Sequence, residues 1–135
     1  MRLIVAVDDN NGMMFNHRRQ SQDSVVRERI LQMSEDAALW INEYTKKQFG
    51  DIPPYVHVSD TPLEEAYSGE FCFIEDTGVA LYRDRIEEVV IFRWNRRYPG
   101  DMEFDFFPQD HGMELVKSED FKGSSHEKIT MEVWK

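Results

Sequence analysis

Four short apolar runs separated by polar and helical segments constrain the fold of this chain more than any other feature. The first, 3–7 (LIVAV), lacks the alternation of a half-exposed strand and suits a central strand covered on both faces. The others are 38–41 (ALWI), 71–74 (FCFI) and 89–94 (VVIFRW). The interval between Phe49 and Phe71 has room for one more strand and one more helix. This alternation predicts a mostly parallel sheet.

The character of the chain changes after Pro99 and Gly100. Three strand-like segments follow, at 105–107, 113–116 and 128–134, and the turns between them leave no room for helices. Strands joined in this way pair antiparallel. We therefore expect a single α/β domain over residues 1–135, with a mostly parallel central sheet and antiparallel C-terminal strands.

The first two predicted helices carry recognisable caps. Residues 21–33 place apolar side chains at helical spacing, with Ser21 as the expected N-cap. Asn42 is expected to cap a helix over 43–49, which Gly50 ends.

Two later segments are also predicted to be helical. Thr61, Pro62 and Glu64 form the pattern of a capping box with proline at the first helical position, and Gly69 is expected to close that helix. Residues 79–86 (VALYRDRI) predict a further short helical segment.

Composition indicates a folded protein with an acidic surface. Hydrophobic residues make up 41% of the chain, and the formal net charge is -10. Such a charge repels phosphate backbones, so no nucleic-acid partner is expected.

Cys72 is the one cysteine and lies in an apolar run, which predicts a buried thiol. Because no apolar run approaches the roughly 20 residues of a membrane span, we expect a cytoplasmic protein without a membrane partner.

The order of these elements, with particular residues at their junctions, resembles the dihydrofolate reductase family. The stretch 3–13 (LIVAVDDNNGM) is similar to that family's first strand and the start of its mobile active-site loop, with Gly12 and Met13 at the matching glycine-hydrophobic pair. Residues 96–108, 113–121 and 124–134 are similar to its closing segments and final hairpin. The resemblance runs along nearly the whole chain and implies a three-layer α/β/α domain.

The resemblance places Asp23 where the family keeps its single active-site carboxylate, on the first turn of the first helix. In the family this carboxylate grips the amino-pyrimidine edge of a pterin and helps to protonate the ring before hydride arrives from NADPH. Burial raises the pKa of a carboxyl group, which suits it to such work. The structural alternative is an acid that only stabilises the helix start, where free N–H groups and the dipole favour negative charge.

Several residues depart from the family's pattern where the family binds its cofactor. The glycine pair that lets backbone approach the pyrophosphate corresponds here to FCFIEDTG, in which Glu75 and Asp76 would repel that phosphate. The family's Gly-Arg-x-Thr corresponds to NEYT, which keeps Thr45 and loses the phosphate-binding arginine. Phe92 stands where the family has a threonine that supports the acid. We therefore expect no normal NADPH binding.

The residues that remain predict a pocket for a small molecule. It is formed by Gly12, Met13, Arg18, Arg19, Asp23 and Thr45. The segment 93–98 (RWNRRY) interleaves arginines with aromatic residues, a pattern that stacks and neutralises nucleotides or merely discourages edge pairing of a strand. If 93–98 and 16–20 (NHRRQ) converge around Asp23, the ligand is expected to be anionic.

Metal-binding patterns are absent from the sequence. The four histidines are scattered and match no zinc-site spacing, and 8–12 (DDNNG) does not follow the offsets of a calcium-binding EF-hand loop. We therefore expect no metal, and a polar turn at 8–12.

Three functions stay open at this point. The first is a divergent dihydrofolate-reductase-like protein that binds a small heterocyclic or anionic ligand near Asp23. The second is an NADPH-dependent pterin or folate reductase in which Asp23 is catalytic. The third is a protein-interaction module without enzymatic activity, in which the loop between Met13 and Asp23 closes the pocket.

Overall fold

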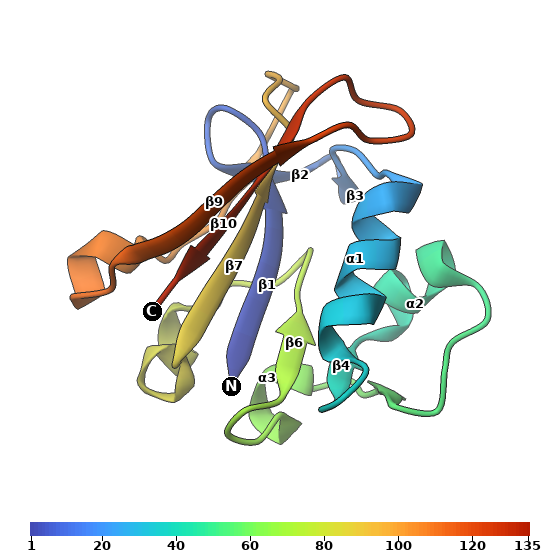
Figure 1. Cartoon of the computed structure of the whole chain (residues 1–135), viewed down its shortest axis with the longest axis vertical. Coiled ribbons are helices and arrows are strands. Elements are labelled where there is room, and N and C mark those ends of the chain that lie inside the picture. Colours follow the sequence, from blue (N-terminus) through green and yellow to red (C-terminus); the bar gives the residue numbers. More distant parts are fainter.

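A seven-stranded sheet forms the centre of the computed structural model, which describes residues 1–135 (Figure 1). In spatial order the strands are β5 (Val56–Val58), β4 (Leu39–Ile41), β6 (Phe71–Phe73), β1 (Arg2–Val7), β7 (Glu88–Arg93), β10 (Ile129–Trp134) and β9 (Leu115–Phe121). The strands from β5 to β7 are parallel, whereas β10 pairs antiparallel with both β7 and β9. The predicted sheet is confirmed.

Helices connect the parallel strands and cover both faces of the sheet. They are α1 (Ser24–Ser34), α2 (Glu43–Phe49) and α3 (Pro62–Glu65), with two 3-10 turns, η1 (Ala80–Arg85) and η2 (Pro108–His111). Figure 1 shows α1 lying across one face, and α3 packs on the other. The α/β class is therefore also confirmed. None of the helices combines the length and apolar character needed to cross a membrane.

The two faces of β1 carry the two cores of the molecule. Leu3, Val5 and Val7 belong to the core beneath α3, whereas Ile4 belongs to the core beneath α1. All four side chains are fully buried. The expectation that 3–7 is a central strand covered on both faces is confirmed, and its unbroken apolar pattern follows from this double burial.

A second, small sheet was not expected from the sequence. It consists of β3 (Arg18–Arg19), β2 (Gly12–Phe15) and β8 (Met102–Glu103), paired antiparallel in that order. The prediction of a strand at 105–107 is wrong. Asp105 instead accepts hydrogen bonds from the backbone N–H groups of Val79 and Ala80, at 2.8 and 3.3 Å, and so ties this segment to the start of η1.

The helix caps agree with the sequence in part. Asn42 caps α2 as predicted, accepting a hydrogen bond of 3.0 Å from the Thr45 N–H. Asp23, rather than Ser21, is the N-cap of α1, because its extended backbone brings its carboxylate to the Val25 N–H.

The predicted capping box before α3 does not form. Thr61 makes no side-chain cap hydrogen bond, and α3 ends at Glu65 instead of running to Gly69. Gly69 has a φ of 80° in the turn that leads into β6, so its conformational freedom serves this turn and not a helix end.

Truncation of one apolar side chain of β1 tests the double burial of this strand. We expect Leu3→Ala to lower the free energy of unfolding by about 2–5 kcal/mol, because Leu3 is 0% exposed and its loss leaves a cavity. Leu81→Ala is the matched control. Since Leu81 is 91% exposed, its truncation should change stability by less than about 0.5 kcal/mol. Urea denaturation measures both, and equal losses would contradict the assignment.

Candidate functional site

The candidate site lies at the carboxyl ends of the central parallel strands, where open α/β sheets bind ligands. Asp8 follows β1, Glu75 follows β6 and Trp94 follows β7. The loop 122–128, between β9 and β10, arches over the N-terminal end of α1 (Figure 1). The site is therefore assembled from segments that are far apart in the sequence.

The Asp23 carboxylate is buried and fully hydrogen-bonded at the N-terminus of α1. It is 2% exposed. Its Oδ1 atom accepts from the N–H groups of Val25 and Ser124, both at 2.9 Å, and from the Ser124 hydroxyl at 3.2 Å. Its Oδ2 atom accepts from the N–H and hydroxyl of Ser125 at 2.9 and 3.1 Å, and lies 2.9 Å from His126 Nδ1. These contacts hold the loop 122–128 against α1.

These hydrogen bonds reverse the electrostatic expectation for Asp23. Burial alone raises the pKa of this carboxyl group, but the hydrogen bond from His126 and those from the backbone of Ser124, Ser125 and Val25 outweigh burial. The pKa of Asp23 is therefore held well below its usual value. The expectation of a raised pKa is wrong, because sequence alone did not show that the loop 122–128 supplies donors to this acid.

His126 joins Asp23 to two hydroxyl groups. Its Nε2 atom lies 2.9 Å from the Ser21 hydroxyl and 3.1 Å from the Tyr98 hydroxyl. The imidazole stacks on Trp94 with ring centroids 4.5 Å apart and planes inclined by 20°. The sequence predicted Ser21 only as a helix cap and assigned no role to His126. No spacing in the sequence could connect them, because 105 residues separate the two.

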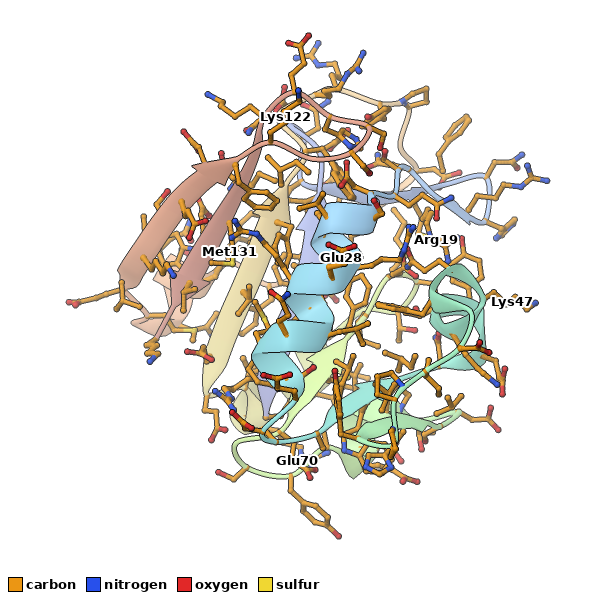
Figure 2. All side chains as sticks on the ribbon, turned by 45° about the vertical axis from the view of Figure 1, so that its right-hand side comes forward. Arg19, Glu28, Lys47, Glu70, Lys122 and Met131 are labelled. Atoms are coloured by element: carbon orange, nitrogen blue, oxygen red, sulfur yellow. The ribbon has the colours of Figure 1, made fainter.

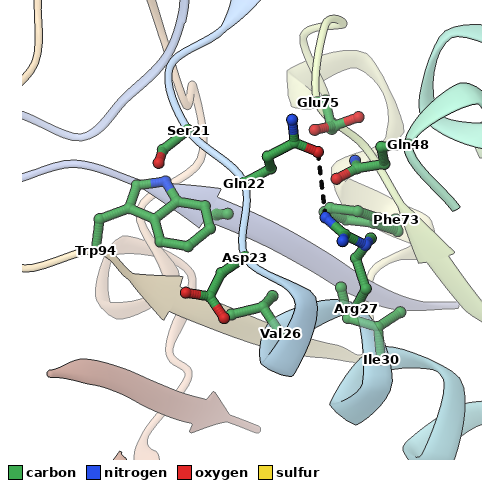
Figure 3. A pocket seen from close by; sticks show the side chains of 11 residues that line it. Ser21, Gln22, Asp23, Val26, Arg27, Ile30, Gln48, Phe73, Glu75 and Trp94 are labelled. Atoms are coloured by element: carbon green, nitrogen blue, oxygen red, sulfur yellow. Dashed lines mark hydrogen bonds between the residues drawn. The ribbon is translucent and has the colours of Figure 1, made fainter. Parts of the chain in front are cut away.

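The pocket directly beside Asp23 is almost filled by side chains. Its free volume is about 10 Å³, room for one water molecule at most. Figure 3 shows Arg27 and Gln22 extending across this pocket, joined by a hydrogen bond of 3.1 Å. The Asp23 carboxylate points to the side of the pocket formed by Trp94. The pocket beside Asp23 therefore has no space for a heterocyclic ligand.

Arg19 neutralises Glu75 at the end of β6. The guanidinium donates two hydrogen bonds to the Glu75 carboxylate, at 2.8 and 3.2 Å, and Thr45 donates a third at 2.8 Å. Figure 2 shows Arg19 beside α2. The Arg19 guanidinium carbon lies over the Tyr44 ring, 4.4 Å from its centroid. Burial lowers the pKa of Arg19, but the hydrogen bond and charge of Glu75 outweigh this effect and raise it. Two predicted ligand residues, Arg19 and Thr45, are thus both bound to Glu75.

The other predicted pocket residues lie elsewhere. Met13 is 4% exposed and belongs to the core beneath α3, whereas Arg18 is exposed to solvent. The Gly12 N–H donates to the Asp8 carboxylate at 2.8 Å, and a Cβ at Gly12 would collide with Gln20. Gly12 therefore permits close packing of the loop 8–20.

Asp8 joins the segments 16–20 and 93–98, whose convergence around Asp23 the sequence left open. Its carboxylate is 1% exposed and accepts hydrogen bonds from the Tyr98 N–H at 3.0 Å and from the Gln20 side chain at 3.3 Å. Gln20 also donates to the Pro99 carbonyl at 3.2 Å. The predicted polar turn at 8–12 thus contains a buried acid, which an acid directly after a buried strand could have indicated.

An open groove is bordered by His126. It has a volume of about 510 Å³ and is lined by 94–96 and 125–128. Its charged residues are Arg96, Lys128 and Glu127. This groove is large enough for a small molecule, unlike the pocket beside Asp23.

Comparison with known proteins identifies the architecture. No protein-family model matches the sequence, and no curated protein matches it. Among solved structures, a dihydrofolate reductase from Enterococcus faecalis complexed with NADP(H) and RAB-propyl matches with a TM-score of 0.67 and 12% identity, covering 98% of this chain and 94% of that chain. The chain has a dihydrofolate-reductase-like fold. A dihydrofolate-reductase-like fold at this identity does not establish an activity.

Removal of the Asp23 charge tests its structural role. We expect Asp23→Asn to lower the free energy of unfolding at pH 7 by about 2–4 kcal/mol, because an amide cannot accept from all the donors that surround the carboxylate. Asp51→Asn, at an exposed position, is the control and should change little.

The same pair of variants has a pH signature. Since the folded-state pKa of Asp23 is depressed, its stabilisation is complete above the unfolded pKa of about 4 and is lost as the pH falls below it. The difference between the wild type and Asp23→Asn should therefore narrow from pH 7 to pH 3 in urea titrations. A constant difference would show that the carboxylate charge is unimportant.

The role of Arg19 can be separated from that of its neighbour. We expect Arg19→Gln to lower the free energy of unfolding by about 2–4 kcal/mol, because Glu75 is 8% exposed and would lose its charged partner. Arg18→Gln lies on the same short strand, has no ion pair and should cost less than about 0.5 kcal/mol. Urea denaturation gives the energies, and faster amide exchange over 12–20 in Arg19→Gln alone would show that the ion pair holds the loop.

Proposed function

We propose that this chain uses the dihydrofolate-reductase-like fold to bind a small anionic or heterocyclic molecule beside the Asp23–His126 pair, without normal NADPH binding. The observation that carries the proposal is the groove of about 510 Å³ lined by 94–96 and 125–128. His126 belongs both to this groove and to the hydrogen-bond network of Asp23. The ligand therefore lies next to the network, rather than in the filled pocket.

Charge favours an anion as the ligand. The chain carries a net charge of -10, yet the groove has two cationic side chains, Arg96 and Lys128, against one acid, Glu127. Neither cation forms an ion pair within the chain. Both are exposed and free to meet a carboxylate or phosphate group.

Two observations weigh against NADPH as the ligand. Asp76 follows β6, where an acid disfavours a diphosphate, and Arg19 is already bound to Glu75 and so is not available to a phosphate. Asp23 also lacks the raised pKa that a proton donor at neutral pH requires. In this proposal Asp23 holds one wall of the groove in place and carries no proton to a substrate.

One observation favours the interaction module as a second candidate. β9 is an edge strand of the large sheet, and its first residues, Leu115 and Val116, are 46% and 54% exposed. An open edge with apolar side chains can pair with a strand of another chain. Sedimentation analysis of the purified protein tests this candidate, which a strictly monomeric chain without co-purifying partner would disfavour.

A thermal-shift screen tests the proposed ligand class. The panel contains inorganic phosphate, small dicarboxylates, pterins, nucleotides and nicotinamide cofactors. We expect at least one small anion to raise the melting temperature, because a ligand that binds only the folded chain at 100 times its Kd adds about 2.7 kcal/mol of stability. Arg96→Ser and Lys128→Ser should each raise the Kd of that ligand by about tenfold, because each removes one charge-assisted contact.

Exposed cations outside the groove provide the controls. Arg83→Ser and Lys122→Ser remove the same charges from other exposed positions and should leave the affinity unchanged. Equal weakening by all four variants would indicate a general charge effect and contradict a site in the groove. NADPH oxidation with a pterin, abolished by Asp23→Asn, would instead support the reductase alternative.

A further inference from the structure

Ser21, His126 and Asp23 form a continuous hydrogen-bonded row, which we call the relay. Ser21 Oγ lies 2.9 Å from His126 Nε2, and His126 Nδ1 lies 2.9 Å from Asp23 Oδ2. The hydroxyl, both imidazole nitrogens and the carboxylate follow the order in which a nucleophile, a general base and its orienting acid are arranged in serine hydrolases. We propose that Ser21 is the nucleophile of an ester-cleaving site, with His126 as its general base.

Hydrogen-bond chemistry fixes the proton positions in this row. The ionised Asp23 carboxylate only accepts hydrogen bonds, so His126 Nδ1 carries the proton that points to it. In the neutral imidazole, Nε2 then has a free lone pair, which faces the Ser21 hydroxyl. This is the tautomer that can remove a proton from Ser21.

Packing holds the base in place and leaves the nucleophile accessible. Asp23 and His126 are 2% and 6% exposed, whereas Ser21 is partly exposed. Stacking on Trp94 fixes the plane of the imidazole. A reacting group can therefore approach Ser21, while Asp23 and His126 stay out of water, which strengthens the electrostatic interaction between them.

Backbone donors for a developing oxyanion are present next to the nucleophile. The N–H groups of Ser21 and Gln22 donate to no acceptor within the protein, because the chain has not yet entered α1. In acyl transfer, the N–H of the nucleophile and that of a neighbour commonly stabilise the negative oxygen. These two groups supply that function in the proposed site.

Tyr98 competes with Ser21 for the same lone pair. Its hydroxyl lies 3.1 Å from His126 Nε2 and 3.4 Å from Ser21 Oγ. When Tyr98 donates to Ser21 Oγ, the Ser21 proton is free to point at Nε2. When Tyr98 donates to Nε2, the base is blocked. Tyr98 therefore slows the reaction without taking part in it.

The reaction balances with water as the only co-reactant. Ser21 Oγ bonds to the carbonyl carbon of the ester while its proton moves to His126 Nε2. The bond from that carbon to the alcohol oxygen then breaks, and the alcohol leaves with the proton from Nε2. Water attacks the acyl-serine by the same route, which releases the acid and restores Ser21.

The substrate class is taken from the groove that His126 borders, although Ser21 itself lines the neighbouring narrow pocket, and in this respect only it rests on the proposed function. Arg96 and Lys128 favour esters of small acids that carry a second carboxylate or another anionic group. The reactivity of Ser21 itself does not depend on these cations. Failure of the groove and failure of the relay can therefore be distinguished.

Covalent labelling of the full chain tests the relay. A neutral fluorophosphonate, diisopropyl fluorophosphate, should add once per chain, with loss of fluoride, and peptide mapping should place the adduct on Ser21. Ser21→Ala should abolish labelling, and His126→Gln should slow it about 100-fold, the loss expected for a missing general base. Tyr98→Phe should accelerate labelling, because it removes the competing donor; a purely structural Tyr98 would not.

A matched control keeps the test specific. Ser118→Ala removes an exposed serine on β9 and should label at the wild-type rate. The proposal is overturned by the absence of any adduct under conditions that fully label trypsin, by an adduct elsewhere, or by equal rates in the wild type and Ser21→Ala. Mapping of the wild-type adduct decides the matter even where His126→Gln does not fold.

Two esters then separate the relay from the groove. The rate of nitrophenolate release from 4-nitrophenyl hemisuccinate should exceed that from 4-nitrophenyl acetate, and Arg96→Ser should reduce only the former. Labelling of Ser21 with equal rates for both esters would support the relay and contradict the anionic groove. Ligand-induced thermal stabilisation without labelling would support the groove and overturn the relay.

Discussion

The architecture of the site depends on a buried negative charge that the chain satisfies by itself. Asp23 accepts hydrogen bonds from the first turn of α1 and from three consecutive residues, Ser124 to His126. A buried carboxylate without these donors would be costly. This requirement fixes the loop 122–128 over α1, and with it the groove, the stacking of His126 on Trp94 and the position of Ser21. Gly123 is part of the same constraint, because a Cβ there would collide with the Asp23 carboxylate.

Two further buried acids follow the same rule at neighbouring strand ends. Asp8 binds the backbone and side chains of the segments that flank it, and Glu75 binds Arg19 and Thr45. Each acid is satisfied by the protein itself, so the carboxyl edge of the sheet is held together by internal contacts. Among the hollows that remain, ligand binding is placed in the groove of about 510 Å³ that His126 borders. Ser21 lines the narrow pocket beside Asp23 and is joined to the groove through its hydrogen bond to His126.

The sequence predicted the frame of the molecule better than its site. The unbroken apolar pattern of 3–7 is a direct consequence of burial on two faces, and Asn42 is a local cap, so both could be recognised from nearby residues. The site rests on pairs such as Ser21–His126 and Arg19–Glu75, which are 105 and 56 residues apart. No periodicity encodes such pairs. Asp23 was found only through the family resemblance. The sequence did not reveal the hydrogen-bond donors that lower its pKa.

The separation of these partners along the chain also governs when the site can form during synthesis. The first strand pairs with β6 and β7. The hydrogen-bond donors to Asp23 from the loop 122–128 lie 101 to 103 positions further along the chain. A nascent chain emerges from its amino end, and contacts of such long range form late. A nascent polypeptide that has not been extended to His126 thus contains Ser21 and Asp23 without their histidine, so the relay can form only after His126 has emerged from the ribosome.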